Sequence, residues 1–213
     1  MLDDILKRAV DELRAREEAR DEILALARRV RMLSKQAIMI MHSGDHGGAE
    51  AKIGEAKELL DGLRQFARGH AELMGMNEVQ AAWEEHAEAS ILLELKASGG
   101  FPAPEAVGVP LDAYVLGLGD VVGELRREAL DSLRVGDVEA AETDLQRMEH
   151  IYLSLMSVEE ASILLKGLRR KMDIARGVIE RTRGELTAEA GRRRLAESVR
   201  QMMEKIDRGR SSG

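Results

Sequence analysis

The sequence predicts an all-α protein: a bundle of six to seven helices, with long helices at both ends of the chain. Ala, Leu, Glu, Arg and Met dominate the composition, and all of them favour helix. Apolar residues recur at helical spacing in most of the chain. The three prolines lie close together, at Pro102, Pro104 and Pro110. A length of 213 residues suits one domain, predicted over residues 1–207 with a frayed tail at 208–213.

Composition also excludes several classes of function. The net charge of −7 argues against a general coat for nucleic acids or anionic membranes. Without cysteine the chain has no thiolate metal site. The longest apolar run, 37–41, is far below the roughly 20 residues that span a bilayer. We therefore expect a cytoplasmic protein with no membrane partner. One Trp, two Tyr and two Phe are too few for RNA recognition by base stacking.

Three helices are predicted in the N-terminal half, at residues 2–42, 49–76 and 78–97. Apolar side chains follow one face of each, and the Gly-rich segment 43–48 separates the first two. The second half of the first helix carries a basic cluster, Arg28, Arg29, Arg31 and Lys35. A solvated helix face is the simplest interpretation of such a cluster, and an anion-binding surface is the functional one.

The C-terminal half resumes after the non-helical stretch 98–104. Asp112 is a plausible N-cap for a helix that ends near Arg134, before Gly136. Further helices are predicted at 137–150, 158–182 and 187–206, with Gly184 as the last break. The helix after Asp112 contains Gly117, Gly119 and Gly123. Each interior glycine costs roughly 0.5–1 kcal/mol relative to alanine, so either a closely packed helix or room for a ligand is expected there.

Two acidic pairs are the candidate site. Glu85 and Glu88 are spaced i,i+3, and Asp120 and Glu124 are spaced i,i+4, so each pair shares one helix face. The second pair lies among apolar residues and glycines, where an ionised carboxylate needs a partner. A divalent cation held by both pairs would supply it. His86 points about 100° away from its neighbours along a helix, and we interpret it as surface or polar packing.

The acids also have a simpler interpretation. Acids at helical spacing are common in a chain that is 33% charged, so a solvated surface is the alternative to a metal site. Two other kinds of binding site have less support in the sequence. A ferritin-like di-iron site needs Glu-x-x-His motifs, and no histidine here has a glutamate three residues before it. The glycine-rich segment 43–48 lacks the Lys-Ser/Thr of a phosphate-binding loop.

Several motifs together resemble a known family. They are the basic segment 28–35, the segment Glu85-His86-Ala87-Glu88-Ala89, the stretch 112–137 with its Asp-x-x-x-Glu pair before a Gly-Asp turn, and the segments 168–173 and 181–185. In order and spacing they resemble the translin superfamily, and its TRAX-like and archaeal members rather than translin itself. The nucleic-acid segment of translin is represented only by Phe66, Arg68 and His70.

The resemblance implies a fold, a site and an activity. It implies a translin-like bundle whose four acids, Glu85, Glu88, Asp120 and Glu124, are catalytic and hold Mg²⁺, for which Mn²⁺ could substitute. The implied protein is a Mg²⁺-dependent endoribonuclease for single-stranded RNA segments, of the small-RNA or tRNA-processing type. It acts inside a hollow homo-oligomer, usually an octamer.

RNA contacts are expected first from Arg28, Arg29, Arg31 and Lys35, and second from Arg192, Arg193 and Arg194. One of the four acids is expected to serve as the general base for water. Two alternatives remain open at this stage. One is a non-catalytic protein of the same fold that binds RNA or single-stranded DNA, and the other is a purely structural helical assembly protein.

Overall fold

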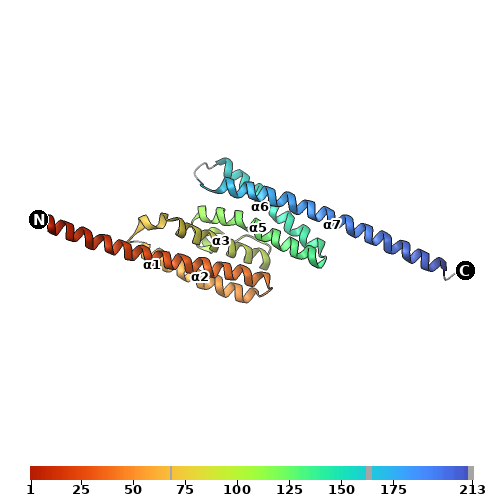
Figure 1. Ribbon diagram of the computed structural model, residues 1–213, viewed down its shortest axis with the longest axis horizontal. Coiled ribbons are helices and arrows are strands. Elements are labelled where there is room, and N and C mark those ends of the chain that lie inside the picture. Colours follow the sequence, from red (N-terminus) through yellow and green to blue (C-terminus); the bar gives the residue numbers. More distant parts are fainter. Residues whose placement is uncertain (68, 162–164, 211–213) are drawn as a thin grey trace. The chain divides into compact units, whose positions relative to one another are not determined.

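The computed structural model describes residues 1–67, 69–161 and 165–210 (Figure 1). Seven α-helices, one short 3-10 helix and no strand occur in these ranges, which confirms the predicted all-α class. The chain forms two compact units, Met1–Val121 and Val122–Gly213. The boundary falls inside helix α5. That the two units make a single domain stays a prediction.

The first unit is built on three helices that contact one another, α1 (Leu2–His42), α2 (His46–Ala67) and α3 (Asn77–Ala97). The 3-10 helix η1 (Ala71–Gly75), the short α4 (Pro104–Val107) and the start of α5 (Leu111–Val135) complete it. Its core consists of apolar side chains with almost no exposed surface, among them Ile23, Met41, Leu60, Leu63, Ile91, Leu92 and Leu95. These residues recur at the spacing of one helix face, so the periodicity of the sequence decides which face of each helix is buried.

Side-chain hydrogen bonds stabilise the segments that connect the helices of this unit. Ser43 ends α1 and donates its hydroxyl to the Ile40 carbonyl at 2.7 Å. The Asp45 carboxylate then accepts from the Gly48 amide at 2.8 Å, which caps the start of α2. Beyond α3, the Tyr114 hydroxyl donates to the Pro102 carbonyl at 2.7 Å and fixes the non-helical stretch to α5.

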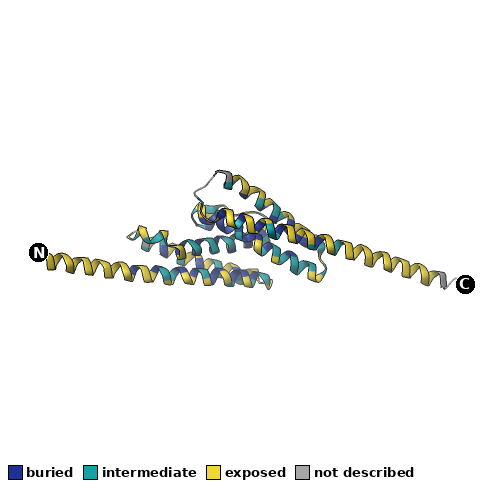
Figure 2. Ribbon diagram, turned by 45° about the horizontal axis from the view of Figure 1, so that its top comes forward, coloured by how far each residue is buried: buried dark blue, intermediate teal, exposed yellow. Residues whose placement is uncertain are grey.

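Helix α1 has the predicted length, but only its second half is packed. Residues 1–18 are all exposed, and the first buried residue is Ala19 (Figure 2). Exposed apolar residues at Leu2, Ile5, Leu6, Val10 and Leu13 still follow one helix face.

The second unit contains the end of α5, α6 (Val138–Ala161) and α7 (Leu168–Arg210). Helices α6 and α7 pack against each other, and Met148, Ile151, Leu155 and Leu168 are almost completely buried. Gly136 adopts φ +83° between α5 and α6, as predicted for a residue that ends a helix. The second half of α7 is solvated, because every residue from 191 to 208 is exposed.

Several predicted helix boundaries were wrong. The helix predicted at 49–76 divides into α2 and η1, and the helix predicted at 137–150 continues to Ala161. The break predicted at Gly184 does not exist, since α7 is continuous through it. Contacts on both sides of Gly184 offset the cost of the glycine. Arg183 pairs with Glu149 at 2.7 Å, and the side chain of Leu186 is buried.

Two other predictions fall partly beyond the described ranges. Ile163 and Leu164, predicted as core residues of a helix at 158–182, lie outside them. The predicted tail at 208–213 is helical to Arg210, and residues 211–213 again lie outside the described part.

Gly117 lies at a close contact between α5 and α3. A Cβ atom on Gly117 would lie 2.7 Å from the Glu84 carbonyl oxygen, 2.8 Å from the Ala87 Cβ and 3.0 Å from the Glu88 amide nitrogen. Two of these atoms are backbone and cannot rotate away. The glycine therefore allows α5 to approach the acidic segment of α3, and helix packing explains at least this one of the three glycines. Gly123, by contrast, would meet nothing within 4 Å.

This difference predicts opposite effects for two substitutions on one helix. Gly117→Ala should lower the free energy of unfolding by about 1–3 kcal/mol, because the new methyl group overlaps the α3 backbone. Gly123→Ala should raise it by about 0.5–1 kcal/mol through helix propensity alone. Urea unfolding followed by circular dichroism measures both. A Gly117→Ala protein as stable as the wild type would contradict the close approach.

Candidate functional site

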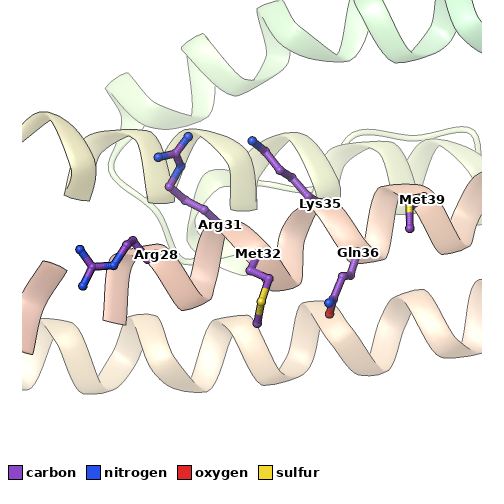
Figure 3. A pocket seen from close by; sticks show the side chains of 6 residues that line it. All are labelled: Arg28, Arg31, Met32, Lys35, Gln36 and Met39. Atoms are coloured by element: carbon purple, nitrogen blue, oxygen red, sulfur yellow. The ribbon is translucent and has the colours of Figure 1, made fainter. Parts of the chain in front are cut away.

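A basic groove runs along the packed half of α1. It has a volume of about 440 Å³ and is lined by Arg28, Arg31, Met32, Lys35, Gln36 and Met39 (Figure 3). Three of the four predicted RNA-binding residues line it, and the fourth, Arg29, is exposed on the same helix. Arg31 and Lys35 are one turn apart and point to the same side of α1, away from Met32 and Gln36.

Glu85 of α3 lies directly against this groove. Its Oε1 atom accepts from Arg31 Nε at 2.9 Å and lies 2.8 Å from the second guanidinium nitrogen. The ammonium group of Lys35 is 3.4 Å from the same oxygen. Glu85 is 16% exposed, so the two cations stabilise a carboxylate that is largely withdrawn from water. One predicted metal ligand is thus ion-paired with two predicted RNA contacts.

The second oxygen of Glu85 has a different environment. Oε2 is buried and has no hydrogen-bond partner. A buried carboxylate oxygen with unused lone pairs is an acceptor that needs a donor or a cation. The environment of Oε2 therefore suits a role of Glu85 as a metal ligand.

The positions of the remaining three acids follow from the geometry of α3 and α5. Glu88 is half-buried on α3, one turn after Glu85. Asp120 is half-buried on α5, three residues after Gly117, so it shares the face that approaches α3. Glu124 is also half-buried and lies one turn further along α5. The structure thus places Asp120 close to the helix contact that carries the first acidic pair.

A closed metal centre is not formed by these side chains. Within the described ranges, no three Asp, Glu, His or Cys residues gather closely enough to hold an ion. The donor set is nevertheless all carboxylate, which suits Mg²⁺ or Mn²⁺. The four acids as a metal site therefore stay a prediction.

His86 has a clear structural role instead. The expected surface position of His86 is wrong, because the side chain is completely buried, and packing is the part of the interpretation that holds. The pKa of His86 is lowered to about 4, chiefly by burial and in smaller part by the nearby Lys57 and Arg64, while the backbone of Val107 and the carboxylate of Asp61 oppose the shift. Neither ring nitrogen makes a hydrogen bond of good geometry. At neutral pH the imidazole is therefore an uncharged core group.

The other predicted nucleic-acid residues lie elsewhere. Arg192, Arg193 and Arg194 are exposed on α7, and the first two pair with Glu189. Phe66 and His70 contact each other, with ring centroids 5.9 Å apart. Arg68 lies outside the described residues.

The sequence did not predict the Glu85 ion pair. Arg31 and Glu85 are 54 residues apart, and each had a separate predicted role. Sequence spacing shows which residues share one helix face, but it cannot show which faces of two distant helices meet. The only available signal was charge complementarity between the basic cluster and the first acidic pair.

The chain matches a known protein family over much of its length. The model of the translin family matches residues 63–182, more than half of the chain. The chain belongs to the translin family. An uncharacterised protein of Methanocaldococcus jannaschii is 29% identical over 201 residues, which cover 93% of this chain and 89% of the relative.

Solved structures agree with the assignment. The crystal structure of AfC3PO is 35% identical, with a TM-score of 0.80, and the match covers 88% of this chain and 98% of that one. AfC3PO has also been solved as a complex with duplex RNA, at 35% identity and a TM-score of 0.79 over 88% and 97% of the two chains. Apo-NeC3PO is 26% identical, with a TM-score of 0.78 and coverage of 86% and 96%. The predicted translin-like fold is therefore confirmed.

The helices also bear on the expectation that the chain has no membrane partner. None of those in the described ranges combines the length and the apolar character that crossing a bilayer requires.

The shifted pKa of His86 predicts a pH dependence of stability. The unfolded histidine binds a proton near pH 6.5, whereas the folded one does so only near pH 4. The stability that His86 contributes is therefore complete above pH 6.5 and is lost as the pH falls toward 4, by up to about 3 kcal/mol. Urea unfolding between pH 7 and pH 4 measures the loss.

A variant and its control isolate this effect. His86→Gln should remove much of the slope, even if it lowers stability at every pH. His46→Gln, at the exposed start of α2, should leave the slope unchanged. Equal slopes in all three proteins would contradict the assignment to His86.

Proposed function

We propose that this chain is a metal-dependent endoribonuclease that acts as a homo-oligomer. The observation that carries the proposal is the contact between Glu85 and the basic groove. It brings a predicted catalytic acid within 2.8 Å of Arg31, a predicted phosphate contact. A nuclease needs both kinds of group at one place, because the scissile phosphodiester must lie beside the metal.

Each group has a role in this proposal. Arg28, Arg31 and Lys35 bind and orient the RNA backbone along the groove, and Arg29 adds to the positive field. Glu85, Glu88, Asp120 and Glu124 would hold Mg²⁺ or Mn²⁺. When bound, the metal offsets charge on the phosphate and activates the attacking water. One of the acids accepts the proton of that water.

Relatives support the RNA part of the proposal. AfC3PO, 35% identical, binds duplex RNA in its complex. The resemblance to TRAX-like proteins supports the nuclease part, because all four acids of that pattern are present here. Single-stranded segments of a small RNA or a tRNA are the substrates that this resemblance implies.

Assembly into an oligomer is supported by two apolar stripes. On α1 the stripe consists of Leu2, Ile5, Leu6, Val10 and Leu13, and on α7 of Leu195, Val199, Met202, Met203 and Ile206. These side chains are 45–67% exposed. Contiguous apolar stripes of this kind usually mark protein–protein contacts. We propose that copies of this chain cover them, in an octamer as the family resemblance implies.

The nuclease proposal predicts the loss of cleavage when single acids are neutralised. Glu88→Gln or Glu124→Gln should each lower the Mg²⁺-dependent cleavage rate by about 100-fold or more, because a metal ligand is lost. The readout is gel analysis of a labelled single-stranded RNA. Glu78→Gln, an exposed acid at the start of α3, is the control and should cleave normally. Full activity in both variants would exclude the four-acid site.

A non-catalytic RNA-binding protein is the second candidate. It is favoured by the existing ion pairs of Glu85 and by the absence of a compact acid group in the described ranges. RNA binding that depends on salt, without cleavage under Mg²⁺ or Mn²⁺, would support this candidate over the nuclease. An absence of RNA binding would instead favour a structural role.

Both candidates predict that the basic groove binds RNA. Arg28→Gln combined with Arg31→Gln should weaken binding and reduce the slope of log K against log salt by about 2, roughly one for each lost phosphate contact. Fluorescence anisotropy at several salt concentrations measures both effects. Arg8→Gln with Arg14→Gln, on the exposed start of the same helix, is the matched control. Equal slopes in the two double variants would exclude the groove.

A further inference from the structure

The ion pairs of Glu85 have a consequence that goes beyond the proposed function but rests on it. Arg31 presents two guanidinium nitrogens, at 2.9 and 2.8 Å, to a single carboxylate oxygen, and Lys35 approaches the same oxygen at 3.4 Å. A phosphodiester oxygen is bound by arginine and lysine in this same way. The carboxylate of Glu85 therefore accepts the contacts that the two cations would make with a nucleic-acid phosphate.

We propose that Glu85 is an internal competitor for RNA: its carboxylate fills a phosphate subsite formed by Arg31 and Lys35, and an RNA phosphate displaces it. The subsite thus consists of two cations one turn apart on α1. Arg28 and Gln36 also line the groove and could contact the neighbouring RNA backbone.

The different exposure of the three side chains explains why a phosphate can replace Glu85 at Arg31 and Lys35. Arg31 is 36% and Lys35 64% exposed, so both cations can be reached by a phosphate from the groove. Glu85 itself is only 16% exposed and cannot be left without a partner when the cations turn away. Its buried Oε2 already lacks a partner. The displaced carboxylate then needs a cation, and the proposed metal would supply one.

Two equilibria follow from this exchange. Without metal, the competing carboxylate weakens RNA binding. Without RNA, the two cations that hold Glu85 weaken metal binding. RNA and metal therefore favour each other's binding, because each one releases a group that the other needs.

The first equilibrium is tested by RNA binding in EDTA, where cleavage plays no part. The probe is a fluorescently labelled RNA duplex with single-stranded ends, followed by anisotropy. Glu85→Gln should bind it about threefold to tenfold more tightly than the wild type, because the amide no longer competes as an anion. Glu78→Gln makes the same change in net charge two turns away on the same helix, and its affinity should stay near that of the wild type.

A double-mutant cycle separates competition from general electrostatics. In a protein with Arg31→Gln and Lys35→Gln, the further change Glu85→Gln should no longer tighten RNA binding. An equal gain from Glu78→Gln and Glu85→Gln, or a gain that persists without the two cations, would overturn the proposal. Circular dichroism verifies that each variant is folded.

The second equilibrium is tested with Mn²⁺ alone, by measuring free Mn²⁺ with electron paramagnetic resonance. Arg31→Gln with Lys35→Gln should raise the Mn²⁺ affinity more than the matched pair Arg28→Gln with Arg29→Gln. Equal affinities of the two double variants would overturn this part. If no protein binds Mn²⁺, the metal part of the proposed function fails, while the RNA measurement in EDTA still decides the competition.

Discussion

The packing of α1 against α3 is the contact on which the candidate site depends. Ile23, Ala27 and Val30 bury one face of α1, and this burial fixes the rotation of the helix about its axis. Once that rotation is set, Arg31 and Lys35 must face α3, where Glu85 lies within ion-pair distance. A hydrophobic stripe with no chemistry of its own thus decides which charges meet.

A second close contact brings the start of α5, which carries Asp120, against α3. Gly117 lets the α5 backbone approach α3 at Glu84 and Glu88, and Asp120 follows one turn later. A larger residue at position 117 would push α5 away and with it the acid. The position of Asp120, an expected metal ligand, thus depends on a glycine. The buried, uncharged His86 lies between Glu85 and Ala87 and belongs to the core rather than to the site.

Charge segregation reconciles a net charge of −7 with the proposed RNA binding. The basic residues that matter are concentrated on one segment of α1, and many of the remaining charges form ion pairs within single helices, such as Arg64–Asp61 and Arg183–Glu180. Such pairs contribute little to stability, but they leave the groove as a local positive surface. Glu85 reduces that positive charge in the absence of RNA, which is why its displacement is expected to control affinity.

The sequence by itself determined the all-α class, the lengths of α1, α3 and α5, and which acids share a helix face, because helical periodicity is a local property. It failed at Gly184, where contacts of Arg183 and Leu186 with other parts of the second unit outweigh a weak helix former. Only the tertiary structure decided that His86 is buried and that Glu85 pairs with Arg31 and Lys35. These facts depend on how helices distant in the sequence rotate and approach one another, which is set by the combined packing of their apolar faces and is encoded in no single segment.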